Sequence, residues 1–218
     1  MTNQITTKIP RMTLSRLPLY YRTLCNLADE GTRRIKSAEL GAATQVEPTT
    51  IRRDFSYFGE LGRSGYGYDV AHLIRIFGEI LEVDEPQYLA LVGVGNLGRA
   101  LLKNNFRRNP NMAIICAFDA DPNLVGQEIN QVIVQPMTEL GATIASLQIN
   151  TAISTVPSHS LQQVAAKLVD NGIRSILSFA PEPVILPEFV NMRYLDLTSE
   201  VLNLLLLSEH GKLAAAKS

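Results

Sequence analysis

Apolar positions follow two different periods along this chain, and the change comes near residue 86. Before it, leucines recur three and four residues apart, as Leu14, Leu17, Leu24 and Leu27 do, which is the spacing of one face of an α-helix. After it, short uninterrupted apolar runs alternate with helical patterns, which is typical of parallel strands joined by crossover helices. We therefore expect an α/β protein with domains over 1–85 and 86–197, followed by a terminal helix over 198–218.

The first domain contains three short helical segments separated by tight turns. Ser37 is expected to cap the second helix, and Pro48 suits the first turn of the third, where no N–H donor is needed. On the third helix Ile51, Phe55 and Phe58 share one face and are expected to pack inward. Three short helices in this order predict a helix-turn-helix core.

The other face of the third helix is polar. Side chains of its types donate to guanine O6 and N7 and to phosphate oxygens when a helix enters a major groove. A solvated face with an ion pair between an arginine and Asp54 is an equally good interpretation of this stretch alone. The candidates for DNA contact here are Thr49, Thr50, Arg52, Arg53 and Ser56.

Residues 59–68 hold four glycines at every second or third position around Arg63. This composition predicts a β-hairpin, and a hairpin after a recognition helix is the wing of a winged-helix domain. Arg63 is then a candidate for a narrow minor groove, whose negative potential attracts guanidinium groups. A plain turn whose glycines supply positive φ is the alternative. Helical spacing resumes over 69–81, and an acidic stretch at 82–86 marks the boundary.

The second domain opens with the apolar run 88–92, which leads directly into a glycine-rich loop. The loop reads Gly93, Val94, Gly95, Asn96, Leu97 and Gly98. The first glycine of such a loop permits a tight bend, the second lets the backbone approach a pyrophosphate, and the third lets a helix pack on the strand. The pyrophosphate then lies at a helix N-terminus. This pattern predicts a dinucleotide site.

Asp119 ends the next apolar run, 113–118. A carboxylate there accepts hydrogen bonds from a ribose 2′-OH and repels a 2′-phosphate, which favours NAD over NADP. Asp121 is a weaker candidate, because Asp-Pro-Asn also forms turns. Further runs over 151–156, 173–179 and 194–197 complete the predicted parallel sheet.

The sequence predicts no catalysis. Only His159, of three histidines, follows a predicted strand near the cofactor, and we interpret it as a polar residue that opens a helix beside a capping serine. Only 198–218 remain after the sheet, which leaves no room for a substrate domain. Because this segment is apolar nearly all round, it is expected to pack on a second subunit, and a two-fold dimer suits palindromic DNA.

Composition and charge narrow the class of protein. The chain has 218 residues, 46% hydrophobic and 19% charged, and no apolar run approaches membrane-spanning length, so we expect a cytoplasmic protein. Residues 1–75 carry eleven Lys or Arg against seven Asp or Glu, a net +4, and the remainder nine against fourteen, a net −5. The positive part suits DNA phosphates. Cys25 and Cys116 are expected to be buried free thiols, with no metal site.

Taken together, these residues resemble the redox-sensing transcriptional repressor family Rex. The matching stretches are Ser15-Arg16-Leu17, residues 51–59, Gly65-Tyr66-Gly67-Tyr68, 92–98, Ala117-Phe118-Asp119, Thr155-Val156-Pro157, Gly172-Ile173, Phe179-Ala180-Pro181 and Asp196-Leu197. The resemblance implies a winged-helix domain, a Rossmann-like domain, and a homodimer whose C-terminal helices are swapped. It also implies an operator-bound repressor that NADH releases, with NAD⁺ competing.

The resemblance also assigns residues. It places the cofactor on the loop 93–98 and on Asp119, and the DNA-reading helix on residues 49–57, which adds Tyr57. The family's switch pair, an Arg on the first helix and an Asp before the partner's C-terminal helix, matches Arg22 and Asp196. An ion pair of this kind between domains biases one of two dimer arrangements. The family often has an aromatic at Asn104 and an Asn at Ser178, and these departures bear on the switch and on cofactor preference.

Two other functions fit parts of the pattern. An NAD-dependent oxidoreductase with an N-terminal extension would turn over a substrate. A DNA-binding regulator whose Rossmann-like domain senses another ligand, such as an acyl-CoA, or no ligand, would not respond to NADH.

Overall fold

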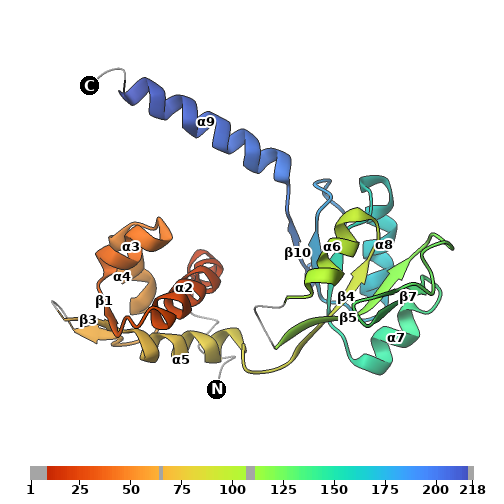
Figure 1. The fold of residues 1–218 in the computed structure, drawn as a ribbon, viewed down its shortest axis with the longest axis horizontal. Coiled ribbons are helices and arrows are strands. Elements are labelled where there is room, and N and C mark those ends of the chain that lie inside the picture. Colours follow the sequence, from red (N-terminus) through yellow and green to blue (C-terminus); the bar gives the residue numbers. More distant parts are fainter. Residues whose placement is uncertain (1–8, 64–65, 107–110, 216–218) are drawn as a thin grey trace. The chain divides into compact units, whose positions relative to one another are not determined.

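The computed structural model describes residues 9–63, 66–106 and 111–215, and the chain divides into two compact parts, 1–85 and 86–218 (Figure 1). The first part is mainly helical and the second is built on a parallel sheet. The sequence period changes at the same place, because the two parts bury their apolar residues in elements of different geometry.

The N-terminal part is a helix-turn-helix followed by a small sheet. Its elements are α2 (Arg11–Asp29), β1 (Arg34–Ile35), α3 (Ser37–Thr44), α4 (Pro48–Ser56), β2 (Gly62–Arg63), β3 (Gly67–Asp69) and α5 (Val70–Leu81). The strands form an antiparallel sheet in the order β1-β3-β2. The predicted third helix and the predicted hairpin are both confirmed.

The turn between α3 and α4 is tight for identifiable reasons. Gln45 ends α3 in the left-handed region with φ of 56°, and Pro48 is the first residue of α4. A Cβ on Gly41 would lie 2.8 Å from the carbonyl oxygen of Val46, so only glycine lets α3 approach this turn. The prediction that Ser37 caps α3 is wrong. The cap position belongs to Lys36, and Ser37 is already helical.

Apolar packing holds the N-terminal helices together. Ile51 and Phe55 of α4 are buried against α2 and α5. The Phe55 ring meets Tyr20 and Phe77 edge-on, with ring centroids 5.4 and 5.2 Å apart. Such aromatic pairs contribute about 0.5–1.5 kcal/mol beyond their buried area. Phe58 is partly buried on the same cluster, as the spacing predicted.

The C-terminal part is a seven-stranded sheet in the order β10-β9-β8-β4-β5-β7-β6, with β6 antiparallel and the other strands parallel. Its strands are β4 (Gln87–Val92), β5 (Met112–Asp119), β6 (Glu128–Ile129), β7 (Val132–Pro136), β8 (Thr151–Ser154), β9 (Ser175–Ser178) and β10 (Asn191–Tyr194). Its helices are α6 (Asn96–Asn104), α7 (Leu140–Leu147), α8 (Ser158–Asp170) and α9 (Leu197–Ala215).

Helices cover both faces of this sheet (Figure 1). Leu102 of α6 packs on one face with Leu91 of β4, whereas Leu140 of α7 and Leu168 of α8 pack on the other. Alternate residues of the central strands therefore enter different cores, and the strands read as continuous apolar runs. This is the Rossmann-like arrangement, and a ligand is expected at the carboxyl ends of the strands.

Two sheet predictions need correction. The hairpin of β6 and β7 was missed: Asn130 and Gln131 both have positive φ and form a two-residue turn of the kind that joins hairpin strands. The last strand was placed at 194–197, but it spans Asn191–Tyr194, and Leu197 already begins α9. The strand reads Asn-Met-Arg-Tyr, in which polar and apolar residues alternate, so it contains no apolar run that would have marked it.

Candidate nucleotide and DNA sites

The glycine-rich loop joins β4 to α6 at the carboxyl edge of the sheet. Gly93 has φ of 92°, and a Cβ there would lie 3.0 Å from backbone atoms of Thr155 and Val156. A Cβ on Gly98 would collide with the carbonyl oxygen of Gly93, so the third glycine permits close packing of helix on strand. A Cβ on Gly95 would meet no atom within 4 Å, which leaves open space at the middle of the loop.

Thr155, which follows β8, holds this loop in place. Its hydroxyl donates to the carbonyl oxygen of Gly93 at 2.6 Å, and its amide donates to the carbonyl oxygen of Val92 at 2.9 Å. Reasoning from the residues gave Thr155 no role, although it lies in one of the stretches that match the family. The feature that could have identified Thr155 is its position directly after β8, the buried strand that pairs with β4.

Asp119 connects the loop to the neighbouring strand. One carboxylate oxygen accepts a hydrogen bond from the Val94 amide at 2.5 Å, and the other accepts from the Asp121 amide at 2.9 Å. A carboxylate has about four acceptor positions, so both oxygens can still accept from ribose hydroxyls. Asp121 itself accepts from the amide of Asn123 at 2.9 Å, which confirms that it forms a turn.

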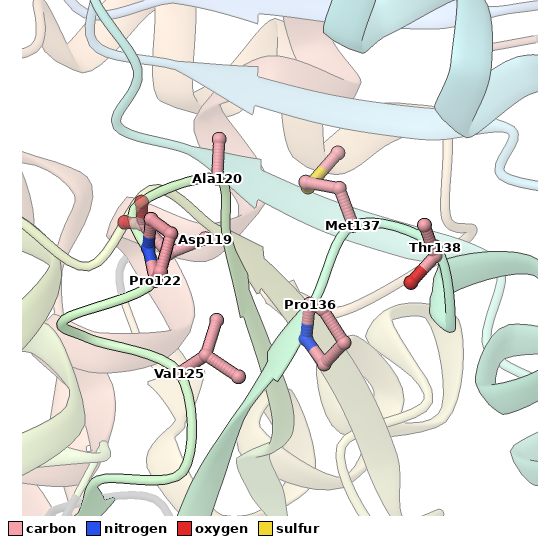
Figure 2. A pocket seen from close by; sticks show the side chains of 7 residues that line it. All are labelled: Asp119, Ala120, Pro122, Val125, Pro136, Met137 and Thr138. Carbon is pink, nitrogen blue, oxygen red and sulfur yellow. The ribbon is translucent and has the colours of Figure 1, made fainter.

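A mostly apolar pocket of about 380 Å³ lies beside Asp119, where β5 and β7 end. Figure 2 shows residues from the loop after β5 on one side and residues from the end of β7 on the other. Its lining residues are Asp119, Ala120, Pro122, Val125, Pro136, Met137 and Thr138. A slot of this character next to a carboxylate suits a flat aromatic base attached to a ribose.

The start of α6 provides hydrogen-bond donors next to this pocket. The first intrahelical bond runs from Arg99 to the carbonyl oxygen of Gly95 at 2.9 Å, so the amides of Asn96, Leu97 and Gly98 precede it and lack helical acceptors. Together with the helix dipole, they favour an anionic group such as a pyrophosphate. No cluster of metal-ligating side chains occurs within the described ranges.

Arg99 supports the pocket from the outside. Its guanidinium donates to the Gln127 side-chain oxygen at 2.8 Å, and the Nε2 atom of the same Gln127 side chain donates to the Asn123 carbonyl oxygen at 2.7 Å. This chain of bonds ties the loop that lines the pocket to α6. The bond between Arg99 and Gln127 could not be predicted from local sequence patterns, since the two residues are 28 positions apart.

The candidate DNA-reading residues are brought together on α4. Thr49, Arg52, Arg53 and Ser56 are exposed and Thr50 is half-buried, while Tyr57 follows the helix and is also exposed. The Arg52 guanidinium donates to the hydroxyl of Ser37 at 2.9 Å, which leaves further donors available. Arg63 lies on β2 of the hairpin, but its side chain is outside the described residues.

Asp54 does not belong to this polar face. Its carboxylate is fully buried and pairs with Arg16 of α2, so the interpretation of α4 as a solvated face paired through Asp54 is wrong. Burial alone would raise the pKa of Asp54, but hydrogen bonds from Arg16, Tyr20 and Thr13 outweigh burial and hold the pKa below its ordinary value.

The two candidate switch residues lie on different parts of the chain. Arg22 is exposed on α2. Asp196 directly precedes α9 and accepts hydrogen bonds from the Ser199 hydroxyl at 2.5 Å and the Thr198 amide at 3.0 Å. The Ser199 bonds hold the pKa of Asp196 below its ordinary value, so this carboxylate is ionised and able to pair with a cation.

The histidine predicted to open a helix lies at the start of α8. His159 is exposed near the start of α8, but Ser158 does not cap the helix; its hydroxyl contacts the Glu182 carboxylate.

Both cysteines are free. Burial raises the pKa of the Cys116 thiol to about 12, whereas Cys25 is only half-buried, so the prediction of burial holds for one of them.

Comparisons with known proteins agree with this two-part architecture. The profile of a family described as "Putative DNA-binding protein N-terminus" matches residues 8–56, and that of "CoA binding domain" matches residues 84–182. The chain is 51% identical over 207 residues to the redox-sensing transcriptional repressor Rex 2 of Enterococcus faecalis, which covers 95% of this chain and 96% of that protein. This chain belongs to the Rex family.

Other Rex proteins give the same result. Identity is also 51% over 201 residues with the redox-sensing transcriptional repressor Rex of Latilactobacillus sakei, covering 92% and 97% of the two chains. RSP, a Rex-family repressor, matches in its crystal structure with NAD⁺ and operator DNA at a TM-score of 0.84 and 29% identity, over 95% and 96% of the chains. The crystal structure of RSP with NADH matches at a TM-score of 0.85 and 27% identity, over 97% of this chain and 99% of RSP.

Membership in the Rex family confirms several predictions made from the sequence. The resemblance and the α/β fold class, with a winged-helix part before a Rossmann-like part, are confirmed, and a transcriptional regulator replaces the oxidoreductase alternative.

The two residues that depart from the Rex pattern lie in different surroundings. Asn104 is the exposed last residue of α6, whereas Ser178 is fully buried, and its hydroxyl bonds the amide and carbonyl of Ala180, both at 3.1 Å.

Proposed function

We propose that this Rex protein binds a palindromic DNA operator as a homodimer and represses transcription until NADH binds its Rossmann-like part. One observation carries this proposal. A single chain joins a helix with an exposed polar face, α4, to a loop whose glycines and Asp119 are arranged for a dinucleotide. Bacterial Rex repressors share nearly the whole chain, so we place this activity in the cytoplasm, where operator DNA and NADH are both present.

The proposed DNA contacts divide into two groups. Arg52 and Arg53 are suited to guanine edges and phosphates in the major groove, supported by Thr49, Thr50, Ser56 and Tyr57. Arg63 of the hairpin is suited to the minor groove next to it. Because these residues come from neighbouring elements of a small domain, one subunit reads one half-site, and two-fold symmetry makes the operator palindromic.

The proposed cofactor contacts follow the geometry of the loop. Amides from Asn96, Leu97 and Gly98 face the pyrophosphate, Gly95 lines its path, and Gly93 makes the turn. Val94 is fully buried and contributes by holding the loop through the bond from its amide to Asp119. The Asp119 carboxylate accepts hydrogen bonds from the adenosine ribose, and the adenine lies in the apolar pocket beside it. NADH and NAD⁺ fit this site equally at the adenosine end, so the nicotinamide end has to distinguish them.

NADH rather than CoA is the ligand that Asp119 favours. CoA carries a phosphate on its ribose, and the carboxylate of Asp119 at the end of β5 would repel it. The ribose of NADH has only hydroxyl groups, which donate hydrogen bonds to the carboxylate. This difference separates NADH from the ligand that the name of the matching family profile suggests.

Release requires that the two ligands prefer different arrangements of the dimer. We propose that NADH favours an arrangement in which the two α4 helices no longer match the half-sites, and that Arg22 and the partner subunit's Asp196 form an ion pair in one of the two arrangements. The C-terminal helix α9, swapped between subunits, joins the dimer. Converting nearly all of the protein from one state to the other takes about 5.5 kcal/mol of differential NADH binding.

Fluorescence anisotropy of a labelled palindrome of the TTGTG…CACAA type, the operator type that the resemblance to Rex implies, tests this function. Salt is held constant, because phosphate contacts dominate affinity. The operator-bound protein is titrated with NADH alone, with NADH in the presence of NAD⁺, and with CoA alone. We expect NADH to release the DNA, NAD⁺ to oppose NADH, and CoA to have no effect. DNA binding that no dinucleotide changes would contradict the cofactor assignment, and NADH binding without DNA binding would favour an enzyme.

A further inference from the structure

The reading helix α4 is attached to α2 through one buried carboxylate. Asp54 accepts from the Thr13 hydroxyl at 2.8 Å, the Tyr20 hydroxyl at 2.7 Å, and the Nε and Nη2 atoms of Arg16, both at 2.7 Å. We call these four residues the Asp54 clamp. All three donors come from α2, at spacings of three and four residues, which places them on one face of that helix.

The Asp54 carboxylate is fully satisfied and buried, whereas the side chain of Arg16 remains 20% exposed. Asp54 and Tyr20 have no exposed surface, and Thr13 is 2% exposed. Each oxygen of Asp54 receives two hydrogen bonds, which fills the four acceptor positions of a carboxylate. The two Arg16 bonds come from adjacent nitrogens of one guanidinium and fix its plane relative to the carboxylate.

Stability alone does not explain a buried ion pair at this position. Removing two charges from water is costly, and well-packed apolar residues in their place often leave a protein equally stable or more stable. Ile51 and Phe55 already attach α4 to the core. Apolar packing is non-directional, however, whereas four hydrogen bonds to one carboxylate fix the rotation of α4 about its own axis.

That rotation determines where the reading side chains point. Atoms on the outer surface of a helix lie about 5–6 Å from its axis, so a rotation of about 20° moves them by about 2 Å. Hydrogen bonds to base edges span only about 2.7–3.2 Å between heavy atoms. A shift of that size would break base contacts from Arg52 and Arg53, while flexible contacts to phosphates could re-form.

We propose that the Asp54 clamp is a positioning device that sets the angle of the reading helix, and thereby the discrimination between operator and other DNA. This inference rests on the proposed DNA-binding function. Asp54 touches no base in this account; it acts through Arg52 and Arg53, the two exposed residues that precede it in α4. Operator discrimination therefore depends on the clamp more strongly than folding does.

Three variants of the full-length protein test the clamp. Asp54→Asn removes the charge, and the combined variant Thr13→Val, Arg16→Met, Tyr20→Phe and Asp54→Leu replaces the clamp with apolar side chains. Leu73→Ala is the matched control, because Leu73 is fully buried in α5 and belongs to the same core but not to the clamp. Urea unfolding, NADH affinity, and affinities for the operator and for a scrambled duplex are measured for each.

We expect both clamp variants to lose at least tenfold in the ratio of scrambled to operator dissociation constants. The loss should come from weaker operator binding, with binding of the scrambled duplex and of NADH changed less than twofold. Leu73→Ala should lower the urea midpoint and keep the ratio. A folded clamp variant that keeps the ratio overturns the proposal, and so does an equal loss of ratio in Asp54→Asn and Leu73→Ala at equal stability.

The test separates the clamp from the proposed function. If the parent protein bound neither duplex, the repressor function would be contradicted. Amide hydrogen exchange would then test whether the Asp54 clamp holds α4 in place. Faster exchange across α4 in Asp54→Asn than in Leu73→Ala, at equal global stability, supports a device that holds α4. Equal exchange in the two variants overturns it. If the combined variant did not fold, Asp54→Asn and its control would decide by the same criteria.

Discussion

At the scale of single residues, Asp119 connects the glycine-rich loop to the end of β5. It accepts the Val94 amide and the Asp121 amide, and it borders the pocket at the end of β5. Its place was predictable from the sequence, because the acid at the end of the second strand is set by local order along the chain. The partners of Asp54 were not predictable, because Arg16 lies 38 positions away and local patterns contain no information about that contact.

Asp119→Ala should weaken NADH binding by about 10- to 100-fold, since a hydrogen bond to a charged group contributes about 1.5–3 kcal/mol. The same change should narrow the preference for NADH over NADPH, because the repulsion of a 2′-phosphate disappears. Titrations followed by the fluorescence of NADH and of NADPH measure the affinities for the two cofactors. Asp121→Ala is the control, as this carboxylate only shapes the turn at Asn123. Unchanged NADH affinity in Asp119→Ala would defeat the ribose assignment.

Asp54 should make the N-terminal part sensitive to acid. The folded-state pKa of Asp54 is lowered, so its ionisation stabilises the fold above the unfolded carboxyl pKa of about 3.9, and this contribution is lost as pH falls through the lower, folded value. The difference in unfolding free energy between the parent and Asp54→Asn should therefore shrink from about pH 5 downward. Urea unfolding followed by circular dichroism at several pH values measures it. A difference that stays constant down to pH 3 would contradict the lowered pKa.

At the scale of elements, α4 and the hairpin of β6 and β7 show what sequence patterns reveal. The start of α4 at Pro48 and its buried face at Ile51 and Phe55 followed from proline geometry and helical spacing. The hairpin was missed because its turn is Asn130-Gln131, which lacks glycine, although both residues adopt positive φ. Three of the seven residues that line the apolar pocket lie at the end of β7 or directly after it, so the shape of the pocket could not be predicted without that strand.

Changing Arg52 and Arg53 together to Ala should abolish specific operator binding and leave NADH affinity unchanged. If both arginines also neutralise phosphates, the slope of log affinity against log salt should fall by up to about 1.8, since each contact contributes about 0.9. Anisotropy at several salt concentrations measures the slope. Arg75→Ala is the matched control, because Arg75 is an exposed arginine of α5 that pairs with Glu79. Retained operator specificity in the double variant would rule out α4 as the reading helix.

At the scale of the whole molecule, α9 exposes apolar side chains that our account assigns to a second subunit. Val201, Leu202, Leu204 and Leu206 are all more than half exposed. Apolar residues on several sides of a helix require burial on more than one side. The sequence predicted this much, but swapping of α9 between subunits stays a prediction. Within the described ranges, none of the helices combines the length and apolar character needed to cross a bilayer.

Ending the chain after Asp196 should convert the dimer to a monomer and weaken operator binding at least 100-fold, because one half-site contact remains instead of two. Light scattering coupled to size-exclusion chromatography measures the mass. Val201→Glu combined with Leu204→Glu provides a milder variant of the intact chain and should weaken the dimer in the same direction. A truncated protein that remains dimeric would place the subunit interface elsewhere.

In this account NADH and operator DNA bind one protein at two coupled sites. The most direct measurement is the dissociation constant of NADH for the full-length protein, determined with and without saturating operator at one salt concentration. Linkage requires that operator weaken NADH binding by the same factor by which NADH weakens operator binding, within the roughly 5- to 150-fold range of typical coupling. Equal NADH affinity in the presence and absence of operator would contradict the account.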